Sequence, residues 1–262
     1  MATYLDRILE GHRAAAAADA RSLEPLLDTA RGMDPARGFE AALRATGERQ
    51  LAVIAEVKRR SPSKGDLAPD LDPAETAVEY DRGGATCLSV LTDADWFGGS
   101  PADLAAARAA VTIPVLRKDF TVDARDVADA RLMGADAVLL IVAALDDAEL
   151  AGFHALAVEI GLDALVEVHD EAELERAVAV GATLIGVNQR DLVTFEVDTE
   201  RAVRVGAAMP EGIVRVAESG IRGTDDALAL AAAGFHAVLV GESVVTSGNR
   251  AESVTRLRVR RK

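Results

Sequence analysis

The sequence has little cysteine and no long apolar run, and each shortage excludes a class of protein. Cys87 is the only cysteine, so it cannot form an internal disulfide or complete a cysteine-ligated metal site. It is expected to be a buried thiol in the middle of a strand. No uninterrupted apolar stretch of about 18 residues occurs, and the opening MATYLDRILEGHR is amphipathic, unlike a secretion signal. These absences predict a soluble, cytoplasmic protein with no membrane partner.

Positive charge is also scarce. The chain has 43 acidic and 29 basic side chains among its 262 residues, which gives a formal net charge of −14. Nucleic-acid phosphates are repelled by such a surface, so no nucleic-acid partner is expected, despite the short basic tail RLRVRRK. The acidic residues are spread along the chain as a solvated coat, which suggests halophilic adaptation. We expect a monomer, with a weak dimer as the alternative.

Few of the basic residues are lysines. The lysines are Lys58, Lys64, Lys118 and Lys262, and every other cationic side chain belongs to arginine. Arginine stays protonated, whereas the pKa of a lysine can be shifted for proton transfer. The few lysines therefore indicate positions that need an amine, although chance placement is the alternative.

Eight short apolar runs, each followed by a helical pattern, begin at residue 51. Near-continuous apolar strands separated by helices are typical of a parallel sheet covered by helices. Eight such units favour a (β/α)8 barrel over a doubly wound sheet, and no GxGxxG follows the first strand. The fold class is therefore α/β, a single TIM-barrel domain over 1–262, with a helical extension (1–48) packed on the barrel (49–262). The predicted strands are 51–57, 85–91, 113–116, 137–142, 164–168, 184–187, 213–219 and 237–241.

Charged and amide side chains stand where several of these strands end. In a barrel, the carboxyl ends of the strands face the active-site mouth. Burying so many ionisable groups together is costly unless they serve one another or a ligand, so they predict an acid–base site. Lysines among the carboxylates would compete with a divalent cation, and no metal is expected. The residues are Glu56 and Lys58 at the end of the first strand, Lys118 at the end of the third, Glu167 at the end of the fifth, Asn188 and Arg190 at the end of the sixth, and Glu218 at the end of the seventh.

The loops around these residues suggest a phosphate and an aromatic ring as ligands. ESGIRG after the seventh strand and GES after the eighth place glycines where backbone N–H groups can approach an anion. RRSPSKGD after the first strand suits a mobile flap over the same phosphate. Trp96, Phe97, Phe120 and Pro62 offer an apolar wall. His169 is expected to leave its strand and to be an ordinary loop residue.

A series of motifs in order along the chain resembles the indole-3-glycerol phosphate synthase family. They are AEVKRRSPSKG, LTDADWFGGS, VLRKDF, VEVHDEAEL, IGVNQRDLVTFEVD, VAESGI and GES. The resemblance spans about residues 50 to 245 and includes the strand ends. It implies a carboxy-lyase of tryptophan biosynthesis that needs no cofactor. The reaction is ring closure of 1-(2-carboxyphenylamino)-1-deoxy-D-ribulose 5-phosphate to indole-3-glycerol phosphate, with loss of carbon dioxide and water.

The resemblance also implies roles for individual residues. Lys118 would be the general acid that protonates the ribulose carbonyl, and Glu167 the base of the later dehydration. A second cation nearby, Lys58, and a partly desolvated mouth are expected to lower the pKa of Lys118. Lys58 would pair with the substrate carboxylate, while Glu56, Asn188, Glu218 and Ser219 would position these groups. The substrate or its phosphate would be surrounded by Ser61, Arg190, Gly220, Gly241 and Glu242, the last acting through its backbone N–H. The anthranilate ring would contact Pro62, Phe97, Phe120, Leu139 and Leu239.

Other barrel functions remain as alternatives. Phosphoribosylanthranilate isomerase and the tryptophan synthase α subunit are phosphate-binding barrels as well, but an isomerase would need its acid–base pair elsewhere. A class I aldolase would form a Schiff base on Lys118. A non-catalytic phosphate sensor would have no need for opposed lysine and glutamate pairs.

Overall fold

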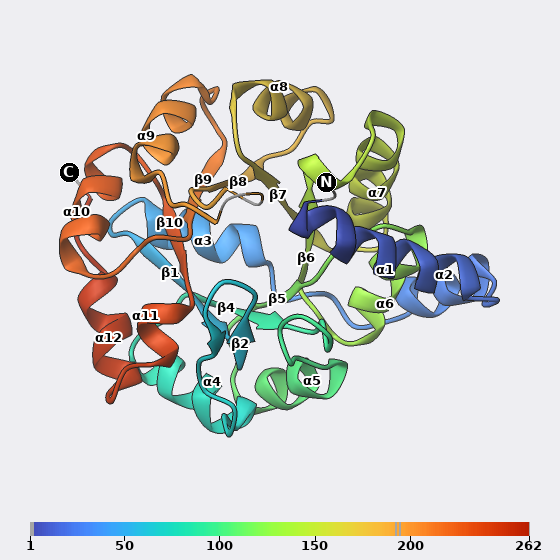
Figure 1. Cartoon of the computed structure of the whole chain (residues 1–262), viewed down its shortest axis with the longest axis horizontal. Helices are drawn as coiled ribbons and strands as arrows, with labels where there is room; N and C mark the ends of the chain where they lie inside the picture. The colour runs from blue at the N-terminus through green and yellow to red at the C-terminus, as the bar shows by residue number, and fades with distance from the viewer. Residues whose placement is uncertain (1–2, 192, 194, 262) are drawn as a thin grey trace.

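Eight parallel strands close into a barrel in the computed structural model, which describes residues 3–191, 193 and 195–261 (Figure 1). Around the barrel the strands follow the order β1-β10-β9-β8-β7-β6-β5-β4. Each of the eight predicted strands is present, and the predicted (β/α)8 fold is confirmed. The strands are β1 (Ala52–Val57), β4 (Cys87–Leu91), β5 (Val115–Lys118), β6 (Ala137–Ile141), β7 (Asp163–Val168), β8 (Leu184–Asn188), β9 (Val214–Glu218) and β10 (Ala237–Val240).

The strands lie in the core because both of their faces are covered. All residues of β1, β4 and β6 are buried, with one face toward the barrel interior and the other toward the helices. Closure joins β1 to β10, with Ala52 paired to Ala237. Cys87 is buried as predicted, but it is the first residue of β4 and does not lie in mid-strand. Its thiol is thus at the end of the barrel opposite the strand carboxyl ends.

Helices surround the barrel, and aspartate side chains cap many of their N-termini. Asp72, Asp123, Asp146, Asp170 and Asp198 each accept a hydrogen bond from a backbone N–H of the first turn. Part of the acidic composition thus serves helix initiation. The helices are α4 (Pro73–Arg82), α5 (Pro101–Ala110), α6 (Ala124–Leu132), α7 (Asp147–Glu159), α8 (Glu171–Ala179), α9 (Thr199–Ala208), α10 (Thr224–Ala232), α11 (Glu242–Val245) and α12 (Arg250–Leu257), with a 3-10 turn at Val142–Ala144.

The N-terminal extension forms α1 (Tyr4–Ala18), α2 (Leu23–Arg31) and α3 (Phe39–Gly47), as predicted. α3 packs beneath the barrel, where the carbonyl of Phe39 accepts a hydrogen bond from the Cys87 thiol. α1 lies at the opposite end and runs outward across the molecule (Figure 1). Arg13 of α1 forms an ion pair of 2.7 Å with Glu149 at the start of α7. Helix starts follow strand carboxyl ends, so α1 covers part of the barrel mouth.

Two further segments refine the sequence-based prediction. The flap after β1 contains a hairpin, β2 (Arg60–Ser61) and β3 (Gly65–Asp66), which the sequence pattern did not indicate. The basic tail packs under the barrel, where the Arg261 guanidinium donates to the carbonyls of Gly47 and Gly234. Lys262 lies outside the described residues.

Across the described ranges, no helix is long and apolar enough to cross a membrane.

Replacing Gly83 with alanine is expected to destabilise the protein by about 1–3 kcal/mol, since overpacking of a close helix contact forces backbone shifts. A Cβ at Gly83 would lie 2.5 Å from the backbone oxygen of Ala251 in α12. Gly152, within α7, is the matched control because its Cβ would meet nothing within 4 Å. Gly152→Ala is expected to raise the free energy of unfolding by about 0.5–1 kcal/mol, because alanine has a higher helix propensity than glycine. Urea unfolding of both variants is the measurement, and equal stability would contradict this account of α4–α12 packing.

Candidate active site

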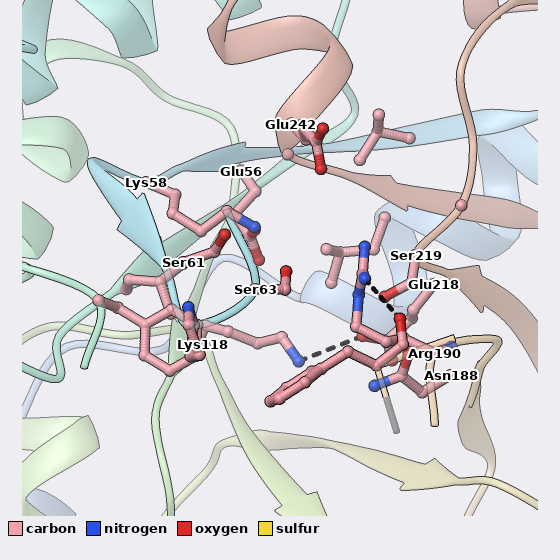
Figure 2. A pocket seen from close by; sticks show the side chains of 18 of the residues that line it. Glu56, Lys58, Ser61, Ser63, Lys118, Asn188, Arg190, Glu218, Ser219 and Glu242 are labelled. Carbon is pink, nitrogen blue, oxygen red and sulfur yellow. Dashed lines mark hydrogen bonds and ion pairs between the residues drawn. The ribbon is translucent and has the colours of Figure 1, made fainter. Parts of the chain in front are cut away.

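A cavity of about 700 Å³ opens at the carboxyl ends of the strands. Its walls bring together the residues that the sequence predicted for the site, except Trp96, from all eight strands of the barrel or the loops after them. Figure 2 shows Lys58 and Glu56 on one side of it, Asn188 and Arg190 on another, and Lys118 extending toward Glu218. The predicted residues in its walls are Glu56, Lys58, Ser61, Pro62, Phe97, Lys118, Phe120, Leu139, Glu167, Asn188, Arg190, Glu218, Ser219, Gly220, Leu239, Gly241 and Glu242.

Lys118, the last residue of β5, lies between two carboxylates, one from β7 and one from β9 on the opposite side of the barrel. Its Nζ is 2.8 Å from Glu167 Oε2 and 3.2 Å from Glu218 Oε2. The Lys118 side chain is only 15% exposed, and both glutamates are buried. The barrel makes this approach because β5, β7 and β9 alternate around the ring and each directs its last inward-facing residue to the centre.

The electrostatics of Lys118 correct one expectation. Burial by itself lowers the pKa of Lys118, but the carboxylates of Glu167, Glu218 and Glu56 outweigh burial and hold the pKa above its ordinary value. The expected lowering by Lys58 is therefore wrong for the protein without substrate, because Lys58 faces Glu56, with Nζ–Oε1 2.5 Å apart. The carboxylates around Lys118 therefore favour its ammonium form.

Glu167 and Glu218 are buried in the same cavity, but their pKa values are shifted in opposite directions. Burial opposes ionisation of Glu167, yet Lys118 and His169 dominate and lower its pKa. For Glu218, burial is the largest effect and raises the pKa, with the negative Glu167 acting in the same direction. Asn188 Nδ2 donates to Glu167 Oε1 at 3.0 Å. The backbone N–H of Arg190 donates to Asn188 Oδ1, which orients the amide. The Glu167 carboxylate is thus oriented by Asn188 and favoured in its ionised form.

Two glycines leave room for these carboxylates. A Cβ at Gly241 would overlap Glu56 Oε1 and lie 2.9 Å from Lys58 Nζ. A Cβ at Gly186, in β8, would overlap Glu218 Oε1. The side chains of Glu56, Lys58 and Glu218 therefore occupy space that any other residue at these two positions would fill. This explains two glycines inside or beside strands, where glycine ordinarily weakens the structure.

The loops after β9 and β10 form one wall of the cavity. Ser219 and Gly220 have positive φ angles of 66° and 72°, so the chain turns sharply at the end of β9. Gln189 Nε2 fixes this turn by donating to the carbonyl of Ser219 at 2.7 Å. Across the cavity, Lys64 of the flap hairpin has its Nζ 3.9 Å from Glu242 Oε1, at the start of α11. The flap thus brings one cation to the acidic start of α11.

The sequence-based list missed the contribution of α1. Tyr4, Leu5 and Ile8 line the cavity, and the Tyr4 ring packs edge-on against Trp96 at 4.9 Å and Phe195 at 5.1 Å. Trp96 is not part of the described cavity wall, so its expected place beside the substrate is replaced by packing under α1. The amphipathic start of the chain was a signal of this apolar face. Only the fold, however, places that face over the mouth.

One group of ligand-type side chains lies beside the cavity. His12 Nε2 is 2.9 Å from Asp93 Oδ2 and 3.9 Å from Asp119 Oδ1, a geometry that a metal ion could use. Their atoms have partners already: Asp119 bonds Thr92 and Arg117, and Asp93 accepts from the backbone N–H of Trp96. The cluster therefore ties α1 to the loops after β4 and β5.

His169 differs from its expected place as an ordinary loop residue. It does leave the strand, one residue after β7 ends at Val168. Its side chain, however, is 12% exposed and turns inward, with Nε2 3.7 Å from Glu167 Oε1. Residues 167 and 169 are two apart and continue the same face of an extended chain. That spacing was a signal for its position.

The fold and the site define a (β/α)8-barrel enzyme with an acid–base centre of lysine and glutamate at the strand carboxyl ends. The family model "Indole-3-glycerol phosphate synthase" matches residues 5–257. The chain belongs to this family.

Individual relatives agree with this assignment. An indole-3-glycerol phosphate synthase of Mycolicibacterium vanbaalenii is 51% identical over 98% of this chain and 94% of its own length. One of a Nocardioides species is 52% identical over 97% of this chain and 98% of its own length. Among solved structures, a thiamine phosphate pyrophosphorylase from Pyrococcus furiosus has a TM-score of 0.60 at 19% identity, over 79% of this chain and 93% of that one. At that identity the likeness concerns the fold alone.

Proposed function

We propose that this chain closes the indole ring of indole-3-glycerol phosphate from 1-(2-carboxyphenylamino)-1-deoxy-D-ribulose 5-phosphate, with loss of carbon dioxide and water. The observation that carries the proposal is the position of Lys118 between Glu167 and Glu218 inside the cavity. Attack of the anilino ring carbon on the ribulose ketone develops an alkoxide, which needs a proton donor. A fully protonated lysine beside an ionised glutamate supplies the acid for this step and a base for the next one.

The two halves of the reaction are assigned to different residues. Lys118 donates its proton to the ribulose carbonyl oxygen as the new carbon–carbon bond forms. Carbon dioxide then leaves from the ring carbon that carried the carboxylate. Glu167 takes the proton that is lost during dehydration, and Lys58 pairs with the substrate carboxylate and assists the departure of hydroxide. Glu56 holds Lys58, while Asn188, Glu218 and Ser219 orient the acid and the base.

Substrate binding divides the cavity into a charged and an apolar part. The phosphate is proposed to lie against the loops after β9 and β10, with Gly220, Gly241 and the Glu242 backbone N–H as donors. Ser61 and Arg190 complete this part. The anthranilate ring is proposed to lie against the apolar side chains. These are Pro62, Phe97, Phe120, Leu139 and Leu239.

The test is direct assay of the purified chain. Adding the carboxyphenylamino-deoxyribulose phosphate is expected to produce the fluorescence of an indole, with release of carbon dioxide. Absence of indole product from the folded wild type would refute the proposal. Borohydride added during turnover is expected to leave Lys118 unmodified, whereas a trapped secondary amine would point to Schiff-base chemistry.

We also propose that 1–262 form one domain and act as a monomer in the cytoplasm without nucleic acid. The extension 1–48 is bonded to the barrel at several points: Arg125 donates to the carbonyl of Ala16, and Arg37 to those of Val111 and Ile113. A single unfolding transition by circular dichroism and fluorescence is expected, with a monomer mass by light scattering. Two separated transitions would contradict the one-domain proposal.

The acidic composition supports adaptation to salt. Self-repulsion at a net charge of −14 opposes compactness, and salt screens it within about 8–10 Å at physiological strength. The melting temperature is therefore expected to rise as potassium chloride is increased. Full stability in dilute buffer without added salt would count against the adaptation.

A further inference from the structure

A buried imidazole stands behind the proposed catalytic base. His169 lies at the end of β7, and Glu173 in the first turn of α8 reaches back to it. Glu173 Oε2 accepts the backbone N–H of His169 at 2.7 Å and lies 3.0 Å from its Nδ1. A carboxylate can only accept, so Nδ1 carries a proton and donates it to Glu173.

The other ring nitrogen determines the charge of the ring. His169 Nε2 is buried and has no hydrogen-bond partner in the part of the chain that the structure describes. The nearest carboxylate oxygen is Glu167 Oε1, at 3.7 Å. An unprotonated Nε2 would direct a lone pair at this anion, whereas an N–H there would be attracted to it. The geometry therefore favours protonation of both nitrogens.

The charges around the ring favour the same state. Burial by itself opposes a charged imidazole, but Glu173 and Glu167 outweigh it and raise the pKa of His169. Arg201 of α9 acts in the opposite direction, and its guanidinium is also close to Asp191 and the carbonyl of Asn188. The charged groups from β7, α8 and α9 thus leave two carboxylates against one cation around the ring.

We propose that His169 is a positioning residue for Glu167, an imidazolium that is fixed by Glu173 and keeps the Glu167 carboxylate ionised and oriented. The role rests on the proposed function, in which Glu167 is the base of the dehydration. Glu167 uses Oε2 for Lys118 and Oε1 for Asn188 and His169. When Lys118 gives its proton to the substrate, it no longer stabilises the carboxylate. His169 is then the cation that remains beside Glu167.

The first test is a set of neutral replacements. His169→Gln removes the charge and keeps a polar group of similar reach. We expect kcat to fall about tenfold and the acidic limb of its pH profile to move up by about one unit, with KM changed less than about twofold. The Glu173→Gln variant is expected to lose activity as pH rises, because without Glu173 the imidazolium of His169 gives up its proton in the neutral range. The matched control is His154→Gln in α7, where burial lowers the pKa and the ring is neutral; no change is expected.

A second measurement does not depend on activity. Nitrogen-15 NMR of histidine-labelled wild type is expected to show His169 with both ring nitrogens protonated at pH 7, and with a single proton at pH 7 in Glu173→Gln. A neutral wild-type ring, or a His169→Gln enzyme with an unchanged acidic limb, would overturn the proposal. Because the NMR reads the ring itself, it distinguishes this failure from failure of the ring-closure assay.

Discussion

Lys118→Arg is expected to lower kcat for ring closure by about 10²–10⁴-fold, the range that a general acid contributes. Arginine keeps the positive charge between Glu167 and Glu218, but it does not give up its proton at working pH. The acid step is the first step, so the substrate should remain unconverted in a single-turnover mixture. Indole fluorescence and mass analysis of the quenched mixture are the measurements.

The matched control for this change is Lys64→Arg on the flap. The Lys64 side chain is exposed, with its Nζ 3.9 Å from Glu242 Oε1, and arginine keeps that charge, so kcat is expected to change less than about tenfold. Thermal unfolding of both variants shows whether the fold is kept. If folded Lys118→Arg retained most of the turnover, Lys118 would not be the acid, even with the overall function correct.

Glu167→Gln is expected to reduce kcat by a similar factor, about 10²–10⁴-fold, but at a later step. The amide has nearly the same shape and can still accept from Asn188, yet it cannot take a proton. Ring closure and decarboxylation should proceed on the variant while dehydration stalls. An intermediate heavier than the product by one water is expected in quenched single-turnover samples.

The control for this variant is Glu171→Gln on the exposed surface of α8, which removes a carboxylate paired with Arg204. Exposed pairs contribute about 0–1 kcal/mol, so activity and stability should stay close to wild type. If Glu167→Gln accumulated unreacted substrate, as expected for Lys118→Arg, Glu167 would act before dehydration and the assignment of roles would be wrong.

Much of the site could be predicted because barrel topology converts sequence position into spatial position. Once eight strand–helix units are recognised, every strand end is known to face one mouth, however far apart the ends are in sequence. Glu56, Lys118, Glu167 and Glu218 could thus be grouped without a structure, and the cavity contains all of them. The limits of the strands followed from the apolar runs to within a few residues.

What the sequence alone determined was therefore the architecture, the family and the set of residues at the mouth, since these follow from periodicity and motif order. Tertiary structure alone decided the direction of the Lys118 pKa shift, because that direction depends on which charged groups lie nearest. Three carboxylates act on Lys118, whereas Lys58 faces Glu56. It also placed Tyr4 over the cavity and turned His169 toward Glu167. Distances of a few ångströms between distant segments set these properties, and a strand pattern carries no information about them.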